Sequence, residues 1–332
     1  MSINPDQKLN HKLFDKTMEV ASMRRGFGDG LVQAGAADKN VVALCADLTE
    51  SLHMQDFKTK YANRFIEIGV AEQNLVTVAS GMAAMGKIPF AGSYAVFSPG
   101  RNWEQIRTTI CLNNVPVKIV GSHVGVSVGP DGASHQALED IAIMRALPNM
   151  VVLSPCDSIE ARKATIAAAK NGKPTYIRLT RDKTPVITSD HTPFEIGKAA
   201  IVFKSAQSKF DIGIIATGHL LYRAMLAAKL LEKDGKSVIV MNLATIKPLD
   251  EHAIIRLAQE TGAIVTVEEH QITGGMGSAV AECLVKNYAV PIEFIGVKDQ
   301  FGQSGTSEEL LAHYGMTEKD IYAAAHKVML RK

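Results

Sequence analysis

The chain has 332 residues, of which 46% are hydrophobic and 21% are charged, and its formal net charge at pH 7 is +2. This composition is that of a globular protein with enough residues for roughly two domains with separate cores, which excludes a disordered chain. So small a net charge produces no broad basic field. We therefore expect neither nucleic acid nor a membrane surface as the main partner.

The cysteines and the chain start indicate where the protein works. Cys45, Cys111, Cys156 and Cys283 lie far apart without a C-x-x-C pair, which argues against a zinc site and favours a reducing compartment. No apolar run reaches the roughly 18 residues that span a bilayer. The polar start MSINPDQKLNHK does not resemble a signal peptide, so we expect a cytoplasmic protein.

A first series of near-continuous apolar strands alternates with helical stretches. Such strands are typical of a parallel sheet that is buried on both faces. The pattern predicts helices at 72–85, 101–112 and 157–170, and strands at 41–46, 64–68, 87–92, 117–123, 150–155 and 175–180.

A second series follows the polar, proline-containing passage 182–197, which has no strong periodicity and is interpreted as a linker. The pattern after it predicts helices near 220–234, 250–261, 276–288 and 317–330, and strands at 211–218, 237–243, 263–270 and 292–297. The predicted fold is α/β, with two consecutive domains based on parallel sheets at 1–190 and 191–332.

The stretch RFIEIGVAEQN (64–74) is the first candidate for a functional site. It reads as a short strand whose end delivers the carboxylate of Glu72 onto the first turn of a helix. By local pattern alone, Glu72 is also explained as a first-turn acid that the helix dipole favours. Both interpretations stay open at this point.

The loop GSHVGVSVGPDGASHQALED (121–140) is the second candidate. Four glycines and a proline give it an unusual backbone, while His123, Asp131 and His135 supply titratable groups. Loops of this kind after a buried strand often carry binding sites, although a structural turn with surface histidines has the same composition. The spacing H-x₇-D-x₃-H matches no metal site.

The segment GGMGSA (274–279) invites a dinucleotide-binding interpretation because it follows a strand and opens a helix. Its spacing departs from G-x-G-x-x-G, and Ile295 and Gly296 stand where a ribose-binding acid is needed. We therefore interpret it as a tight turn for helix packing.

Four ordered motifs resemble the C-terminal half of transketolase, over about residues 15–330. They are GVAEQN, AGSYAVF (91–97), the run from Ser122 to Asp157, and VKDQFGQSGTSEELLAHYG near the C-terminus. The resemblance implies a pyrimidine-binding domain followed by the transketolase C-terminal domain of thiamine-diphosphate enzymes. In full-length transketolases a preceding domain holds Mg²⁺ and the diphosphate with a G-D-G…N motif. The GDG at 28–30 lies inside a predicted helix and is interpreted as coincidence.

The resemblance also assigns roles around the cofactor. Glu72 matches the catalytic carboxylate that hydrogen-bonds the pyrimidine N1′ of thiamine diphosphate. Phe97 and Tyr94 match aromatic residues that pack on the pyrimidine, and Asp47 matches a residue near the thiazolium. Gly100 stands where many relatives place another aromatic residue.

For the substrate, the resemblance implies sugar phosphates, whose phosphates favour guanidinium partners. Asp131 and His135 match catalytic groups that contact the sugar, and the phosphate-binding positions match Arg24, Ser51, His123 and Arg181. Three assignments stay open from the residues themselves. Arg25 could replace Arg24, Arg178 could replace Arg181, and Ser51 could be a helix cap.

The function implied is that of the C-terminal subunit of a split transketolase, which moves a two-carbon ketol unit between a ketose phosphate and an aldose phosphate. It would hold no metal itself and would work as α₂β₂ with an N-terminal subunit that carries Mg²⁺ and the diphosphate. GVAEQN also resembles 1-deoxyxylulose-5-phosphate synthases, but LTRDKTPVI lacks their Y-P-R-G motif. Two further functions stay open, that of the β subunit of a 2-oxo-acid dehydrogenase and that of a non-catalytic assembly subunit.

Overall fold

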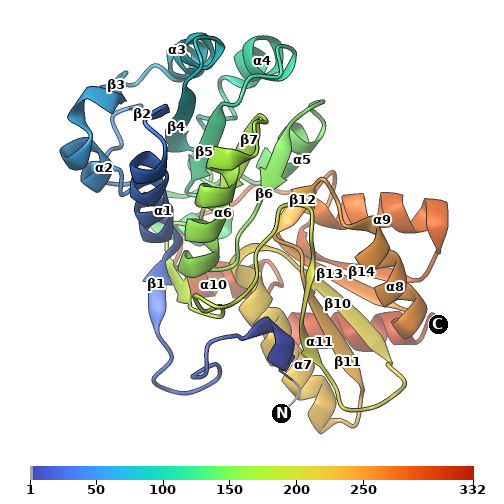
Figure 1. Cartoon of the computed structure of the whole chain (residues 1–332). Coiled ribbons are helices and arrows are strands. Elements are labelled where there is room, and N and C mark those ends of the chain that lie inside the picture. Colours follow the sequence, from blue (N-terminus) through green and yellow to red (C-terminus); the bar gives the residue numbers. More distant parts are fainter. Residues whose placement is uncertain (1–2) are drawn as a thin grey trace.

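Two sheets, each flanked by helices, organise residues 3–332, which the computed structural model describes (Figure 1). The first sheet has seven strands in the order β12-β6-β7-β5-β4-β2-β3, and the second has five in the order β14-β13-β10-β11-β9. All neighbours are parallel except β12 beside β6 and β9 beside β11. The predicted α/β fold is confirmed.

The first domain contains the expected strands and helices and several short additional ones. Its helices are α1 (Met23–Ala37), α2 (Gln55–Lys60), α3 (Glu72–Ala84), α4 (Trp103–Gln105), α5 (Asp140–Arg145) and α6 (Ser158–Lys170). Its strands are β1 (Val20–Ser22), β2 (Val41–Cys45), β3 (Phe65–Glu67), β4 (Ile88–Tyr94), β5 (Lys118–Ser122), β6 (Val151–Leu153), β7 (Thr175–Arg178) and β8 (Lys183–Pro185). α4 continues as a π-helical turn, Ile106–Cys111, and β1 pairs only with β8.

The second domain follows the predicted order closely. Its helices are α7 (Leu221–Lys233), α8 (Glu251–Thr261), α9 (Met276–Asn287), α10 (Ser307–His313) and α11 (Glu318–Met329). Its strands are β9 (Ala200–Lys204), β10 (Ile212–Ala216), β11 (Val238–Asn242), β12 (Thr245–Lys247), β13 (Ile264–Gln271) and β14 (Ile292–Val297). The sequence did not predict β9 or β12, which are short strands at sheet edges.

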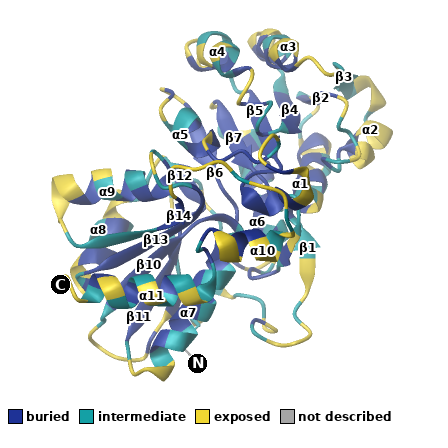
Figure 2. Cartoon of the chain, turned by 180° about the vertical axis from the view of Figure 1, so that it is seen from behind, coloured by how far each residue is buried: buried dark blue, intermediate teal, exposed yellow. Residues whose placement is uncertain are grey.

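The apolar strands are explained by burial on both faces, which Figure 2 shows as dark strands between helices with exposed outer sides. In β2, Val41, Ala43 and Cys45 pack in one cluster with α1 and α6. Val42 and Leu44 point the other way and pack with α3. Because successive side chains alternate between faces, every position of such a strand has to be apolar.

Two segments cross the domain boundary expected at residue 190. β12 belongs by sequence to the second domain but pairs antiparallel with β6 of the first sheet. In the other direction, the N-terminal segment runs down to the second sheet (Figure 1), where Ile3 bridges to Phe203 and the Asn4 amide donates to the Ile201 carbonyl.

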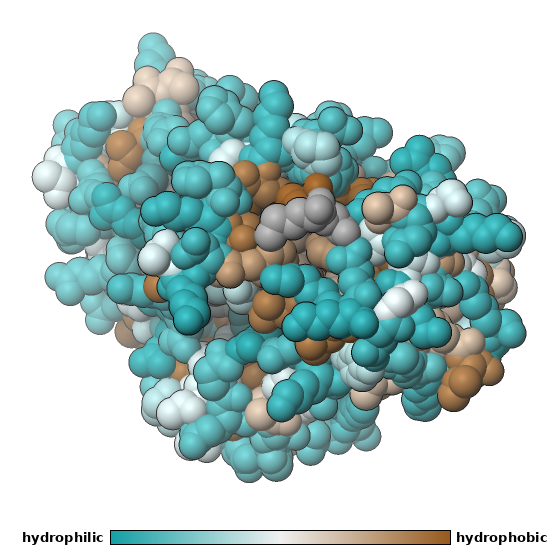
Figure 3. Space-filling view, turned by 90° about the horizontal axis from the view of Figure 1, so that it is seen from below, coloured by the Kyte–Doolittle hydropathy of each residue, from teal (hydrophilic) through white to brown (hydrophobic). Residues whose placement is uncertain are grey.

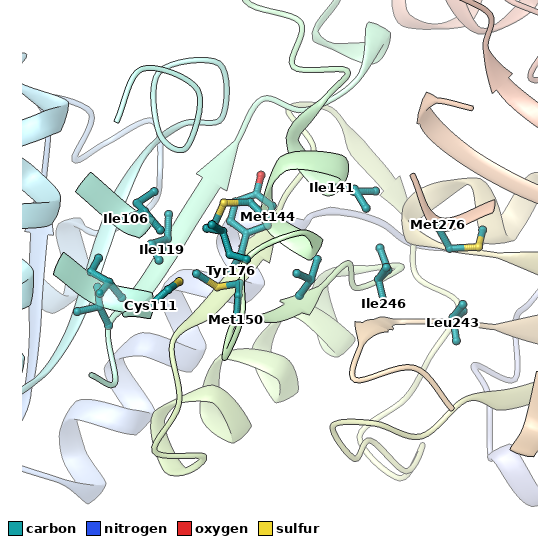
Figure 4. Close-up of a cluster of buried hydrophobic side chains, with 14 of the residues drawn as sticks. Ile106, Cys111, Ile119, Ile141, Met144, Met150, Tyr176, Leu243, Ile246 and Met276 are labelled. Carbon is teal, nitrogen blue, oxygen red and sulfur yellow. The ribbon is translucent and has the colours of Figure 1, made fainter. Parts of the chain in front are cut away.

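A continuous apolar core joins the two domains. Figure 4 shows Ile119, Met144 and Tyr176 of the first domain in one row of buried side chains with Leu243 and Met276 of the second. A core of this kind indicates a rigid junction, because interfaces that permit domain motion are smaller and more polar.

The glycines at 28–30 serve helix packing. A Cβ at Gly28 would lie 2.2 Å from the His53 carbonyl oxygen, and one at Gly30 would lie 2.7 Å from the Arg162 carbonyl oxygen. Asp29 between them pairs with Arg25 on the same helix. This GDG lets α1 approach α6 and does not form a metal site.

The GGMGSA segment is also a packing turn, and its helix N-terminus is already occupied. The buried Glu268 carboxylate accepts hydrogen bonds from the backbone N–H groups of Met276 and Gly277 at 2.6 and 2.8 Å. These are the groups that would otherwise receive a phosphate, so a dinucleotide cannot bind there in this conformation.

On the face seen from below, hydrophobic side chains are concentrated near the centre, and hydrophilic side chains cover most of the remainder (Figure 3). Among residues 3–332, no helix combines the length and the apolar character needed to cross a membrane. All four cysteines are buried and free.

A buried carboxylate at the domain junction makes stability depend on pH. Glu160 of α6 accepts hydrogen bonds from the Cys156 backbone and, at 2.8 Å, from Asn242 of β11. Burial, and after it the charge of Asp157, raises the pKa of Glu160 to about 7. The amide oxygen of Asn242 has no partner among the described residues, and a flip of this amide would present it to a protonated Glu160.

We predict that Glu160→Gln removes a pH-dependent loss of stability. Because the pKa is higher in the folded state than in the unfolded chain, folded protein binds the extra proton between about pH 4.5 and 7, and stability falls as pH rises through that window. Glutamine keeps the neutral form, so the variant should gain up to about 3 kcal/mol over wild type at pH 8 and little at pH 5.

Urea unfolding of wild type and Glu160→Gln from pH 5 to 8 measures this difference. Glu308→Gln, at an exposed carboxylate, is the control. A constant difference between Glu160→Gln and wild type across the range would show that Glu160 is ionised in the folded protein throughout.

Candidate active site

The candidate residues lie where strands of the first sheet end. Parallel strands direct their carboxyl ends to one edge, and ligands of open α/β sheets bind there. The residues that follow these ends are Asp47 and Ser51 after β2, Glu72 after β3, Phe97 after β4, His123 after β5 and Arg181 after β7, and Tyr94 is the last residue of β4. This edge therefore gathers residues that are far apart in the sequence.

Glu72 is the first residue of α3 and only 3% of its side chain is exposed. Its carboxylate accepts a hydrogen bond from Arg101 Nη1 to Oε2 at 2.6 Å. Its backbone carbonyl accepts from the buried Asn102 amide at 2.7 Å. The helix dipole favours an acid in the first turn, and this explains an exposed carboxylate there. It does not explain why the Glu72 carboxylate is almost completely buried, since burial of a charge is unfavourable.

Four rings form a cluster, and Arg101 connects it to Glu72 because its guanidinium lies over the Phe97 ring. Tyr94 stacks on His123 with ring centroids 3.7 Å apart, and Phe97 is 6.3 Å from Tyr94 in a stacked arrangement. His135 meets Phe97 edge-on at 5.5 Å. The rings provide an apolar wall with imidazole nitrogens next to it.

The guanidinium groups of Arg24 and Arg181 lie near the ring cluster. Arg24 donates to the carbonyls of Ser51 and Arg181 at 2.6 and 2.7 Å, and Ser51 hydrogen-bonds the Tyr94 hydroxyl at 2.9 Å. Arg181 donates to the Val128 carbonyl at 3.0 Å. The Nε of Arg24 is buried and has no partner among residues 3–332, so a donor remains for a ligand oxygen.

The structure shows where the residues of the three open assignments lie. Arg25 pairs with Asp29 and Asp56 on the exposed side of α1, and Arg178 is buried against Asp140. Ser51 is not a helix cap, because α2 begins at Gln55 with Met54 as its N-cap.

His123 is held in an unusual state. Its φ of +57° is the left-handed conformation that non-glycine residues seldom adopt, and such strain is concentrated at functional sites. Burial first, and then the charges of Arg24, Arg181 and His135, lower the pKa of His123 to about 3. Its ring is therefore neutral near pH 7 and offers one donor and one acceptor.

The two aspartates are placed differently. Asp47 is exposed and lines an open polar hollow of about 480 Å³ together with Ser51 and Glu67. Asp131 is also exposed, at the end of the turn Val126–Asp131, and no hydrogen bond or ion pair within residues 3–332 joins its carboxylate to the ring cluster. The structure thus brings together all of the predicted site residues except Asp131.

The sequence did not reveal that the second domain holds the glycine-rich loop. The buried Glu269 carboxylate of β13 accepts from the Ser127 backbone N–H at 2.5 Å and from its hydroxyl at 3.0 Å, and His219 Nε2 lies 2.6 Å from it. A Cβ at Gly125 would lie 2.2 Å from this carboxylate. The glycine is therefore required for the close approach.

The chemistry of the site follows from these groups. It has a buried carboxylate that can exchange a proton, an aromatic wall for a flat ring, and guanidinium and imidazole donors for an oxyanion. Within residues 3–332, no three His, Cys, Asp or Glu side chains are arranged to hold a metal.

We predict that the His123 imidazole stays neutral down to about pH 4, which ¹⁵N NMR of the ring nitrogens measures directly. Because this pKa is lower in the folded state than the value of about 6.5 in an unfolded chain, the contribution to stability is lost as pH falls from 6.5 towards 3. His123→Asn should flatten the acid side of the stability curve, with His191→Asn as the exposed control. Protonation of His123 near pH 6 would contradict the prediction.

Comparison with known proteins agrees with this geometry. The family domain described as "Transketolase, pyrimidine binding domain" matches residues 19–186, and "Transketolase, C-terminal domain" matches residues 200–321. Together they cover both sheets of the structure.

Three relatives match almost their full lengths. A Methanocaldococcus jannaschii protein assigned as a transketolase C-terminal section is 42% identical over 90% of this chain and 93% of its own. A 6-deoxy-6-sulfo-D-fructose transketolase subunit of Clostridium sp. (strain MSTE9) is 39% identical over 96% and 98%. A solved structure described as "Split gene transketolase, inactive beta4 tetramer" superposes with a TM-score of 0.87 at 42% identity, over 93% of this chain and 99% of that one. The chain therefore belongs to the transketolase family and is similar to C-terminal subunits of its split members.

Proposed function

We propose that this chain is the C-terminal subunit of a split transketolase that transfers a two-carbon ketol group from a ketose phosphate to an aldose phosphate. The observation that supports it most is the buried Glu72 carboxylate at a strand-to-helix junction, whose partner Arg101 lies over the Phe97 ring. Matches to both transketolase domains support the same proposal.

The residues present fit the pyrimidine half of thiamine diphosphate. Glu72 would share a proton with the ring at N1′ and accept the hydrogen bond when that proton is on N1′. Phe97 and Tyr94 would pack on the faces of the ring, and Asp47 would lie towards the thiazolium. When bound, thiamine diphosphate supplies the nucleophilic carbon that ketol transfer requires. Glu72 would hold and return the proton at N1′.

The guanidinium groups fit an oxyanion at one end of the substrate. Arg24 and Arg181 lie within one hydrogen-bonded group with Ser51, and the neutral His123 ring lies next to it. His135 would contact the hydroxyl groups of the sugar, and Asp131 would join them if the loop tip turned inward on binding. The electrostatics favour a phosphate or a sulfonate.

The chain would depend on a partner for the rest of the cofactor. Mg²⁺ needs several oxygen ligands, and no acidic cluster of that kind lies within residues 3–332. The split-gene transketolase that superposes on this chain is described as an inactive β4 tetramer. We infer that this chain alone forms inactive homo-oligomers, and that an N-terminal subunit supplies the diphosphate and Mg²⁺ site in an α₂β₂ assembly.

Two alternatives are retained, one for the substrate and one for the reaction. The Clostridium relative is named for a sulfonated ketose, and a sulfonate is also a tetrahedral oxyanion that guanidinium groups bind. A 1-deoxyxylulose-5-phosphate synthase activity is the second candidate because GVAEQN resembles that class. The sequence RLTRD around Arg181 favours ketol transfer.

The test is reconstitution with the separately encoded N-terminal subunit. The mixture should convert xylulose 5-phosphate and an aldose phosphate, or the sulfonated ketose in its place, while either subunit alone is inactive. Glu72→Gln in the mixture should retain less than about a tenth of the wild-type rate, since lost acid–base catalysis costs about 10²–10⁴-fold.

Two results would contradict the proposal. One is turnover by the isolated chain with thiamine diphosphate and Mg²⁺. The other is formation of 1-deoxyxylulose 5-phosphate from pyruvate and glyceraldehyde 3-phosphate at a rate comparable to ketol transfer. Native mass measurements before and after mixing report the predicted change from a homo-oligomer to α₂β₂.

We predict that Arg181→Ala raises the KM for phosphorylated substrates by about tenfold or more, with a smaller change in kcat, because uniform binding energy is lost. Arg25→Ala is the control, since Arg25 lies near Arg24 in the sequence but outside the site. Unchanged KM values for all phosphorylated substrates would remove Arg181 from the site.

A further inference from the structure

Arg101 is the only group among residues 3–332 that pairs with the Glu72 carboxylate. The distance from Nη1 to Oε2 is 2.6 Å, and the two side chains are 51% and 3% exposed. A buried carboxylate without a partner is strongly unfavourable, so this contact stabilises Glu72 in the separate chain. The Glu72 carboxylate is buried in the protein, and the Arg101 side chain is open to solvent.

The same guanidinium lies over the Phe97 ring, with Cζ 4.8 Å from the ring centroid. It is a flat group that donates a hydrogen bond to Glu72 and packs on Phe97. An aminopyrimidine ring that carries a proton at N1′ would make the same two contacts in this site. Arg101 therefore occupies the position that the ring needs.

The backbone beside Arg101 is fixed while its side chain has room to move. The buried Asn102 amide donates to the Glu72 carbonyl and to the Ser98 hydroxyl at 2.7 and 3.1 Å. A Cβ at Gly100 would lie 2.0 Å from the Val96 carbonyl oxygen, so this turn excludes the aromatic residue that many relatives have there. The half-exposed Arg101 can leave Glu72 without any movement of the main chain.

We propose that Arg101 is a side-chain gate that closes the pyrimidine site of the separate subunit by binding Glu72 and is displaced when the cofactor binds. This inference rests on the proposed function. Competition of this kind lowers the apparent affinity for the cofactor in proportion to the fraction of open sites. Docking of the partner, which brings the diphosphate site, would supply the remaining affinity.

The first experiment measures binding of 4-amino-5-hydroxymethyl-2-methylpyrimidine, the free ring of the cofactor, to the isolated full chain by calorimetry. Arg101→Met should bind about tenfold more tightly than wild type because the competing donor is gone. Arg331→Met is a matched control, since Arg331 is also 51% exposed and binds Glu293 at 2.6 Å far from the site. Equal or weaker binding by Arg101→Met would overturn the gate and leave Arg101 as a permanent wall of the site.

A second readout does not depend on any ligand. Arg101→Met should lower the thermal midpoint of the isolated chain by about 2–4 °C, and adding Glu72→Gln should restore it, because no charge then remains unpaired. Additive effects of the two changes would show that the residues do not interact in solution.

Measuring thiamine diphosphate binding to the assembly with the N-terminal subunit separates the two proposals. Tighter binding by the Arg101→Met assembly supports the gate. Equal binding by wild type and variant overturns the gate alone. Absence of binding by both assemblies overturns the gate together with the proposed function.

Discussion

The parallel alignment of the first sheet is the constraint on which the site depends. Because β2, β3, β4, β5 and β7 run in one direction, residues as distant in sequence as Val128, after β5, and Arg181, after β7, end in direct contact. Burial on both faces fixes the register, since a shift by one residue would exchange the side chains of the two faces. The positions of the functional loops are thus determined by the apolar core beneath them.

The second domain contributes to the site through a polar contact across the junction. Glu269 holds the loop at Ser127, and the Gln136 amide of the same loop donates to the Gln303 carbonyl at 3.0 Å. From the first domain, Arg181 holds the carbonyl of Val128. The loop that carries His135 is therefore held from both domains, so the second domain helps to position a loop of the first.

The sequence predicted the features that leave a local signal. Strands buried on both faces leave apolar runs, and Glu72 follows one of them, so the fold and the place of this carboxylate at the start of a helix could be predicted from the sequence. The pairing of Arg101 with Glu72 could not, because the residues are 29 positions apart and no periodicity relates them. The sequence also could not predict the contact between Ser127 and Glu269. Nor could it predict that Arg24, and not Arg25, faces Ser51, because this depends on where α1 meets the turn at Ser51.

The position of β12 limits how this chain can be divided. A protein cut near residue 190 would keep the first sheet but lose the strand that covers β6, and the N–H and C=O groups of that edge would face water as a template for pairing with other chains. The second half would in turn lose the N-terminal segment that covers Phe203. Each domain therefore covers a strand of the other, and we expect a cut near residue 190 to leave unpaired backbone groups in both halves.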